Sequence, residues 1–223
     1  MKNKKRKISI IGGTGALGSG LAVRLALAGH SIVIGSREQD RAKTSADDLR
    51  RNFGAKLEVA GMTNSQAADA GDIIFLTVPY LNHQLTLEDI RSQLHGKILV
   101  DATVPLAPPK VRTVHLPEEG AVAKHSQTYL GNDTKVVSAF QNVAATHLAD
   151  PELTIDCDVL VCGNDKEARS IVIELAKDIG MHALHAGRIE NSVVAEALTS
   201  ALIFINARYK ADGAGIRITG ITD

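Results

Sequence analysis

The 223-residue sequence has few of the residues that stabilise small secreted or metal-dependent folds. It contains two cysteines, Cys157 and Cys162, and no tryptophan. Four residues separate the cysteines inside the apolar run IDCDVLVCG, a spacing that fits neither a C-x-x-C redox pair nor a zinc site. The histidines form no recognisable metal-ligand set, and we expect no metal. The sequence therefore predicts two buried free thiols in a reducing, cytoplasmic compartment.

Long apolar segments and an excess of one charge are also missing. No run of about 18 apolar residues is present, which argues against a membrane-spanning helix. Glycines and Arg24 interrupt the N-terminal apolar stretch, which excludes a signal peptide. Lys+Arg and Asp+Glu are equal at 25 each, so no global field favours nucleic acid or an anionic membrane as a partner. We expect a small-molecule partner.

Short β-branched runs alternate with helical patterns along the chain. This order favours right-handed βαβ crossovers and predicts an α/β fold, a Rossmann-type doubly wound and mostly parallel sheet. The expected strands lie at residues 7–12, 31–35, 57–61, 72–78, 97–103, 135–140, 158–163 and 181–186. The expected helices lie at residues 16–29, 38–53, 64–70, 85–94, 118–130, 166–180 and 190–208.

The first strand-to-helix turn, residues 13–18, reads GTGALG and matches G-x-G-x-x-G. In that pattern Gly13 allows the tight turn, Gly15 lets a pyrophosphate approach the backbone, and Gly18 lets helix and strand pack closely. The free N–H groups at the helix N-terminus favour phosphate binding. Because the pattern lies between an expected strand and an expected helix, dinucleotide binding is favoured over a glycine-rich turn without a ligand.

The end of the second strand indicates which dinucleotide binds. An NAD site normally has an Asp or Glu there, which hydrogen-bonds the ribose 2′-OH and repels a 2′-phosphate. This chain has Ser36 and Arg37 instead, and Arg41 follows one helical turn later. A hydroxyl and guanidinium groups suit a phosphate, although both arginines could simply be solvated beside Glu38 and Asp40. The pattern predicts NADP(H).

Two regions are expected: an NADP-binding Rossmann domain over residues 1–155 and a smaller C-terminal domain over residues 156–223. The connection is the loop ADPELTID. The last helix carries apolar residues on nearly every face. It should therefore be buried, either between the domains or between subunits of a homodimer.

No acid–base group is evident beside the glycine loop. The chain has no Tyr-x-x-x-Lys dyad, and the last helix has no Lys between Lys177 and Lys210. His83 and His147 could reach a site at the strand ends, but surface positions are favoured for both. Hydride transfer between two conjugated rings depends on alignment more than on a proton relay. We therefore expect no catalytic side chain and a flavin-like hydride partner.

With these features the chain resembles the F420H2:NADP+ oxidoreductases, also called NADPH-dependent F420 reductases. The resemblance rests on IIGGTGALGSGLAVRLALAGHSIVIGSRE, DIIFLTVPY, KVVSAF, CDVLVCGND and NSVVAEALTSALIFINARY. F420 is an 8-hydroxy-5-deazaflavin that carries hydride. The resemblance implies an NADP-dependent oxidoreductase that transfers a hydride directly between NADP(H) and F420, and a homodimer held in part by the C-terminal helix.

The resemblance also implies a set of cofactor-binding residues. It assigns the pyrophosphate to the glycine loop and the 2′-phosphate to the end of the second strand, and it places the rings between three loops and the last helix. The implied residues are Gly13, Thr14, Gly15, Ala16, Leu17 and Gly18; Ser36, Arg37 and Arg41; Val78, Pro79 and Tyr80; Val104, Pro105 and Leu106; Ala139 and Gln141; Ser192 and Thr199.

One difference from the family pattern concerns the hydride partner. Archaeal members have a His near the rings where this chain has Gln141, which can donate a hydrogen bond but cannot titrate. Two alternatives to F420 therefore stay open at this point. The chain could be an NADPH-dependent reductase of a flavin or of a small imine or carbonyl compound, or a non-catalytic NADP(H) sensor.

Overall fold

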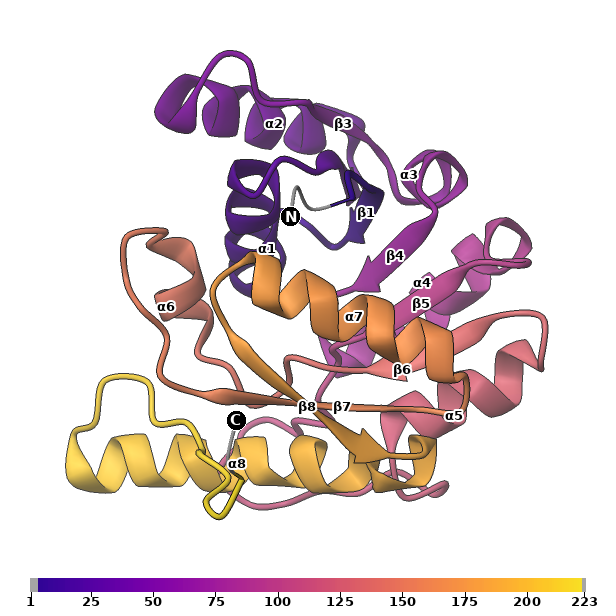
Figure 1. Ribbon diagram of the computed structural model, residues 1–223. Coiled ribbons are helices and arrows are strands. Elements are labelled where there is room, and N and C mark those ends of the chain that lie inside the picture. Colours follow the sequence, from indigo (N-terminus) through magenta and orange to yellow (C-terminus); the bar gives the residue numbers. More distant parts are fainter. Residues whose placement is uncertain (1–3, 222–223) are drawn as a thin grey trace.

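A computed structural model describes residues 4–221, and its core is one eight-stranded sheet (Figure 1). The strand order is β3-β2-β1-β4-β5-β6-β7-β8. All neighbours pair in parallel except β6 and β7, which are antiparallel. The strands are β1 (Lys7–Ile11), β2 (Ser31–Ser36), β3 (Val59–Thr63), β4 (Ile73–Leu76), β5 (Ile98–Asp101), β6 (Lys135–Ser138), β7 (Asp158–Gly163) and β8 (His182–Gly187). The doubly wound, mostly parallel fold is confirmed.

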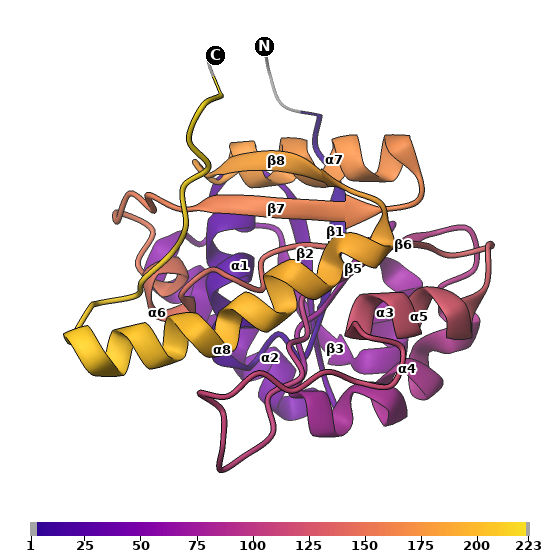
Figure 2. The same ribbon diagram turned by 90° about the horizontal axis from the view of Figure 1, so that it is seen from below.

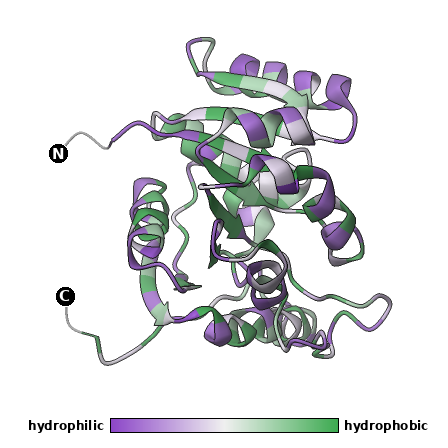
Figure 3. Ribbon diagram, turned by 90° about the vertical axis from the view of Figure 1, so that its right-hand side faces the viewer, coloured by the Kyte–Doolittle hydropathy of each residue, from purple (hydrophilic) through white to green (hydrophobic). Residues whose placement is uncertain are grey.

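Helices cover both faces of the sheet. The helices are α1 (Ala16–Leu27), α2 (Gln39–Phe53), α3 (Asn64–Ala70), α4 (His83–Ile90), α5 (Val122–Leu130), α6 (Ala145–Ala149), α7 (Lys166–Asp178) and α8 (Ser192–Tyr209). Buried side chains of α1, α2, α6 and α7 form one hydrophobic cluster against the sheet, and those of α3, α4 and α5 form a second on its other face. In Figure 3 the central strands are accordingly hydrophobic and the outer helices carry most of the hydrophilic colour.

The sheet continues across the expected domain boundary near residue 155. Ser138 of β6 pairs with Cys162 of β7, so the C-terminal strands extend the same sheet as the first six. A separate domain of residues 156–223 stays a prediction. Cys157 and Cys162 are free and buried, as expected.

Helix α6 was not expected from the sequence, because its five residues have no side-chain cap and no helical pattern of their own. A distant residue supplies what they lack. The buried guanidinium of Arg24, on α1, donates to the backbone oxygens of His147 at 2.9 Å, Leu148 at 3.1 Å and Leu153 at 2.8 Å. Side-chain donors from another helix thus satisfy the carbonyls of this segment.

The long last helix has two different halves. Its first half packs on the protein, with Ala195, Glu196 and Ser200 buried. Its second half is exposed within one chain: Phe204 is 52% exposed and Tyr209 is 74% exposed. Figure 2 shows α8 crossing the molecule and reaching beyond the strands at its C-terminal end. No helix of residues 4–221 is long and apolar enough to span a membrane.

Candidate functional site

The loop between β1 and α1 is shaped by its glycines. Gly12 has a φ of +75°, so the residue with the left-handed conformation is Gly12 and not Gly13, where the sequence places the turn. A Cβ at Gly13 would lie 2.7 Å from the Ile10 oxygen, and one at Gly18 would lie 2.6 Å from Thr77 Oγ1. At Gly15 the nearest atom is the Gly12 oxygen, 3.3 Å away. Gly13 and Gly18 therefore serve internal packing, whereas Gly15 leaves an open surface.

The N-terminus of α1 is suited to an anion. Gly15 is its N-cap, and neither a side-chain cap nor an acidic residue is present in the first turn. By contrast, Asp165 caps α7 and its side chain accepts from the Ala168 N–H. The first N–H groups of a helix lack internal partners and carry partial positive charge. In α1 they remain available to a phosphate group.

Ser36, Arg37 and Arg41 lie at the same edge of the sheet as this loop. The parallel register pairs Ile11, the last residue of β1, with Gly35, just before Ser36. Ser36 is buried and its Oγ accepts from the Glu38 N–H at 3.3 Å. Arg37 is exposed, and Arg41 is exposed and lies 3.9 Å from a Glu38 carboxylate oxygen. Two exposed guanidinium groups beside the glycine loop fit the charge of a 2′-phosphate.

The other expected ring-binding loops follow β4, β5 and β6. Because these strands are parallel neighbours, their carboxyl ends meet at one edge. Val78 also reaches the glycine loop, since a Cβ at Gly12 would lie 2.8 Å from its Cγ1. In the β5 loop Pro105 is buried, with half-buried residues on both sides. The structure thus brings residues 78–80 and 104–106, which were expected to bind the rings, to the edge of the sheet that holds the glycine loop.

Helix α8 joins this edge through Gln141, which follows β6. Thr199 Oγ1 donates to the Gln141 carbonyl oxygen at 2.9 Å. Gln141 Nε2 donates to the Asp101 carbonyl oxygen and to Ser138 Oγ, each at 2.8 Å. The buried Oε1 of Gln141 and Oγ1 of Thr103 accept no hydrogen bond from the described residues. Ala139, directly after β6, and Ser192, the first residue of α8, are fully buried. Unused buried polar atoms at a ligand edge are suited to a polar ligand.

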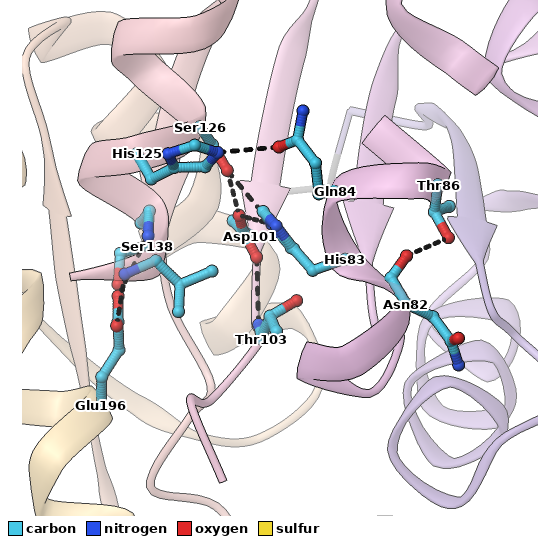
Figure 4. Close-up of polar contacts among 12 residues, drawn as sticks. Asn82, His83, Gln84, Thr86, Asp101, Thr103, His125, Ser126, Ser138 and Glu196 are labelled. Carbon is cyan, nitrogen blue, oxygen red and sulfur yellow. Dashed lines mark hydrogen bonds and ion pairs between the residues drawn. The ribbon is translucent and has the colours of Figure 1, made fainter. Parts of the chain in front are cut away.

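The structure also contains a buried polar cluster that the sequence analysis missed (Figure 4). The Oδ2 atom of Asp101, at the end of β5, lies 2.8 Å from His83 Nε2 and 2.6 Å from Ser126 Oγ. Oδ1 of Asp101 accepts from the Thr103 N–H at 3.0 Å. His83 is 2% exposed. The interpretation of His83 as a surface residue was therefore wrong, because α4 begins at His83 and turns this side chain toward the end of β5.

The protonation of this cluster follows from its contacts. Burial opposes the charged form of His83, but the charge and hydrogen bond of Asp101 outweigh it, so the pKa of His83 is raised. Burial likewise opposes a charged Asp101, yet His83 and the donors Ser126 and Thr103 hold the pKa of Asp101 below its ordinary value. Each residue therefore favours the charged form of the other, a protonated His83 beside an ionised Asp101.

Glu196 of α8 lies close to this cluster. It is 1% exposed, and its two oxygens accept from the N–H groups of Val122 at 2.7 Å and Ala123 at 3.1 Å, at the start of α5. Burial raises the pKa of Glu196 to about 7 in spite of these donors. Glu196 thus links α8 to α5 with a carboxyl group that titrates near neutrality.

A signal for Asp101 was present in the sequence. Asp101 ends the apolar strand KILVDAT, and a charged residue at the carboxyl end of a buried parallel strand is typical of a ligand edge. The partners of Asp101 could not be found in this way, because His83 and Ser126 lie on two separate helices. No group of three or more His, Cys, Asp or Glu in residues 4–221 could hold a metal ion.

Comparisons with known proteins show which sequences and structures this chain is similar to. Residues 7–105 match the family described as NADP oxidoreductase, coenzyme F420-dependent. The F420-dependent NADP reductase of Methanocaldococcus jannaschii is 42% identical over 96% of this chain and 99% of its own. That of Methanothermobacter thermautotrophicus is 38% identical over 97% of this chain and 96% of its own. A crystal structure from Arthrobacter sp. FB24, of a protein proposed to be such a reductase, has a TM-score of 0.79 and 23% identity over 96% of this chain and 99% of its own.

Proposed function

The chain belongs to the family of F420-dependent NADP reductases, and we propose that its glycine loop and its Asp101 edge hold the two substrates of that reaction side by side. It is an NADP-dependent oxidoreductase that transfers a hydride between NADP(H) and F420. The observation that carries the placement of NADP(H) is the uncapped N-terminus of α1 behind Gly15, with Arg37 and Arg41 at the neighbouring strand end.

In this proposal each part of the edge has one task. The N–H groups of residues 14–17 bind the pyrophosphate, and Ser36, Arg37 and Arg41 bind the 2′-phosphate. Residues 78–80 and 104–106 line the space for the nicotinamide and deazaflavin rings. Gln141 Oε1 offers the rings a free hydrogen-bond acceptor, and the nearby α8 residues Ser192 and Thr199 complete that side.

The protein's contribution to the chemical step is alignment. When bound, the nicotinamide would supply or accept the hydride, and residues 78–80 and 104–106 would hold the two rings in contact in a site that excludes water. Buried Pro105 and its half-buried neighbours provide an apolar floor for this purpose. No side chain is assigned a covalent or proton-transfer role.

We further propose a homodimer through the second half of α8. Phe204, Ile205 and Tyr209 are between 37% and 74% exposed within one chain, an apolar surface that one copy alone leaves in water. Ile203→Asp should dissociate the dimer or prevent folding, and Phe204→Asp, at a more exposed position, should dissociate it without unfolding. A monomeric wild-type chain in sedimentation at micromolar concentration would contradict the proposal. A cytoplasmic location, which the two free thiols favour, stays a prediction.

The experiment that tests the function is a spectrophotometric assay of NADPH oxidation. F420, FMN and FAD are offered in turn, and NADH replaces NADPH in a parallel series. Turnover with NADPH and F420, and weak turnover with NADH, is expected. Turnover with FMN or FAD but none with F420 would contradict the proposed substrate and favour the flavin reductase. Binding of NADPH without any turnover would favour the NADP(H) sensor.

A further inference from the structure

Two buried histidines are paired with aspartates at opposite edges of the sheet. His30, just before β2, lies with Nε2 3.0 Å from an Asp178 carboxylate oxygen at the end of α7. His83 lies with Nε2 2.8 Å from Asp101 Oδ2 at the carboxyl edge. Both histidines are 2% exposed. The two pairs can therefore be compared directly: the His83–Asp101 pair lies at the edge that carries the candidate site, and the His30–Asp178 pair lies away from it.

Asp101 differs from Asp178 in the number of loops that it connects. Its Oδ2 accepts from His83, which follows the β4 loop, and from Ser126 of α5. Its Oδ1 accepts from the Thr103 N–H in the β5 loop, and its carbonyl oxygen accepts from Gln141 in the β6 loop. One buried residue thus holds three loops at the edge that carries the candidate ring-binding residues.

The His83 ion pair is a weak source of stability compared with apolar packing. Removing two charges from water costs several kcal/mol in general, and apolar residues of similar volume often serve stability as well. A pair whose oxygens are fully hydrogen-bonded fixes side-chain orientation in a way that apolar contacts do not. The direct effect of the His83–Asp101 pair is on position. The short helical turn of residues 80–82 leads into α4, which begins at His83, and the pair holds this segment against the end of β5.

We propose that His83 and Asp101 are positioning residues that set the β4 and β5 loops for hydride transfer, a role that rests on the proposed function. His83 touches neither substrate in this account. It acts through Asp101, which aligns residues 78–82 on one side and residues 103–106 on the other. The ring-binding geometry then depends on one buried hydrogen bond between two elements distant in sequence.

The test compares four variants of the full chain. His83→Leu removes the donor at similar volume, and His83→Gln keeps an N–H donor. Ser126→Ala removes the second donor to Asp101, together with the 3.2 Å contact between Ser126 Oγ and His83 Nε2, and keeps the hydrogen bond between His83 and Asp101. His30→Leu breaks the matched pair at the far edge. Each variant is examined by thermal melting, by single-turnover hydride transfer at saturating substrates, by binding of 2′,5′-ADP, and by amide hydrogen exchange without ligand.

His83→Leu should slow single-turnover hydride transfer at least tenfold and speed amide exchange in residues 78–82 and 103–106. Its affinity for 2′,5′-ADP should stay within twofold of wild type, because the proposed 2′-phosphate residues lie between the end of β2 and the first turn of α2. His83→Gln should restore the rate to within threefold. His30→Leu should lower the melting temperature as much as His83→Leu does and leave the rate within twofold. The hydride-transfer rate of Ser126→Ala should lie between those of wild type and His83→Leu. If His83→Leu does not fold, the rate of Ser126→Ala is the measurement that tests the proposal.

An unchanged rate in His83→Leu, an equal loss in His30→Leu, or no rescue by His83→Gln would overturn the positioning role. So would a Ser126→Ala rate equal to wild type in the case where His83→Leu does not fold. Failure of the proposed function is visible separately, as absence of wild-type turnover with F420. The exchange comparison between His83→Leu and His30→Leu then still decides whether the pair orders the two loops.

Discussion

The two halves of the carboxyl edge are built in different ways. The half at β1 and β2, here called the backbone half, consists of the glycine loop, the free N–H groups of α1, and the side chains of Ser36, Arg37 and Arg41. All of these groups lie within residues 12–41. The half at β4, β5, β6 and α8, here called the side-chain half, consists of buried side chains from residues 78–199 that hydrogen bonds join through Asp101. A backbone site depends on local geometry, whereas a side-chain site depends on the whole fold. The four predictions below test this difference, from the largest expected effect to the smallest.

The sharpest test of the backbone half lies within the glycine loop. Gly18→Val should cost at least about 3 kcal/mol of unfolding free energy, because its Cβ would approach Thr77 Oγ1 at 2.6 Å and the Gly13 Cα at 2.8 Å. Gly15→Val should fold normally and lose NADP(H) binding, because its side chain occupies the open surface over the loop. Urea unfolding and cofactor titration measure the two losses separately. Near-normal NADP(H) affinity in a folded Gly15→Val chain would show that phosphate binds elsewhere.

The side-chain half should be the more sensitive to pH. The pKa of Glu196 rises from 4.5 to about 7 on folding, so the folded chain favours its protonated form. Its contribution to stability is then complete below about pH 4.5 and is lost as the pH rises through about 7. Glu196→Gln cannot titrate. The difference in unfolding free energy between wild type and Glu196→Gln should therefore move by about 2.5 kcal/mol in favour of the variant between pH 5 and pH 8.

Urea unfolding at several pH values measures this difference. Glu190→Gln, at a carboxylate that is 55% exposed just before α8, is the matched control. A constant difference between wild type and Glu196→Gln across the range would mean that Glu196 stays charged at all these pH values.

Cofactor choice in the backbone half should follow charge. Arg37→Glu should weaken NADPH binding by about 1.5–3 kcal/mol, the usual worth of a hydrogen bond to a charged group. NADH binding should change much less, since NADH has no 2′-phosphate. Arg51→Glu, at an exposed position near the end of α2, controls for net charge. Fluorescence titration with both cofactors gives the four affinities, and equal losses for NADPH and NADH would rule out the assigned 2′-phosphate site.

The backbone half could be predicted from the sequence to a greater extent than the side-chain half. The alternating strands, the glycine loop and the Ser36-Arg37 strand end are local patterns, and they gave the sheet and the NADP half of the candidate site. The buried His83–Asp101–Ser126 cluster was missed because its three residues lie on a strand and two separate helices. Helix α6 was missed for a similar reason, since Arg24 on α1 supplies the donors for its carbonyl groups. The assigned ligand contacts stay predictions.

Among the side chains of the side-chain half, Gln141 should have the smallest effect on the rate of hydride transfer. Its Nε2 donates to Asp101 and Ser138, and its buried Oε1 accepts no hydrogen bond from the described residues. A glutamine cannot titrate, so no obligatory proton passes through it. Gln141→Ala should therefore lower the hydride-transfer rate only about fivefold, equal to about 1 kcal/mol of lost hydrogen bonding. Gln141→Met, which keeps the volume, separates lost polarity from lost packing.

The fate of the transferred hydrogen completes this last test. If the hydride passes directly between the rings, deuterium on the reactive face of the nicotinamide appears intact on the deazaflavin carbon, in wild type and in Gln141→Ala alike. Mass spectrometry of the reduced product in ordinary water measures its retention. Solvent hydrogen at that carbon would exclude direct transfer. Complete loss of activity in Gln141→Ala would instead mean that Gln141 takes part in the reaction itself, and the second half of the edge would then have a chemical role in addition to its role in alignment.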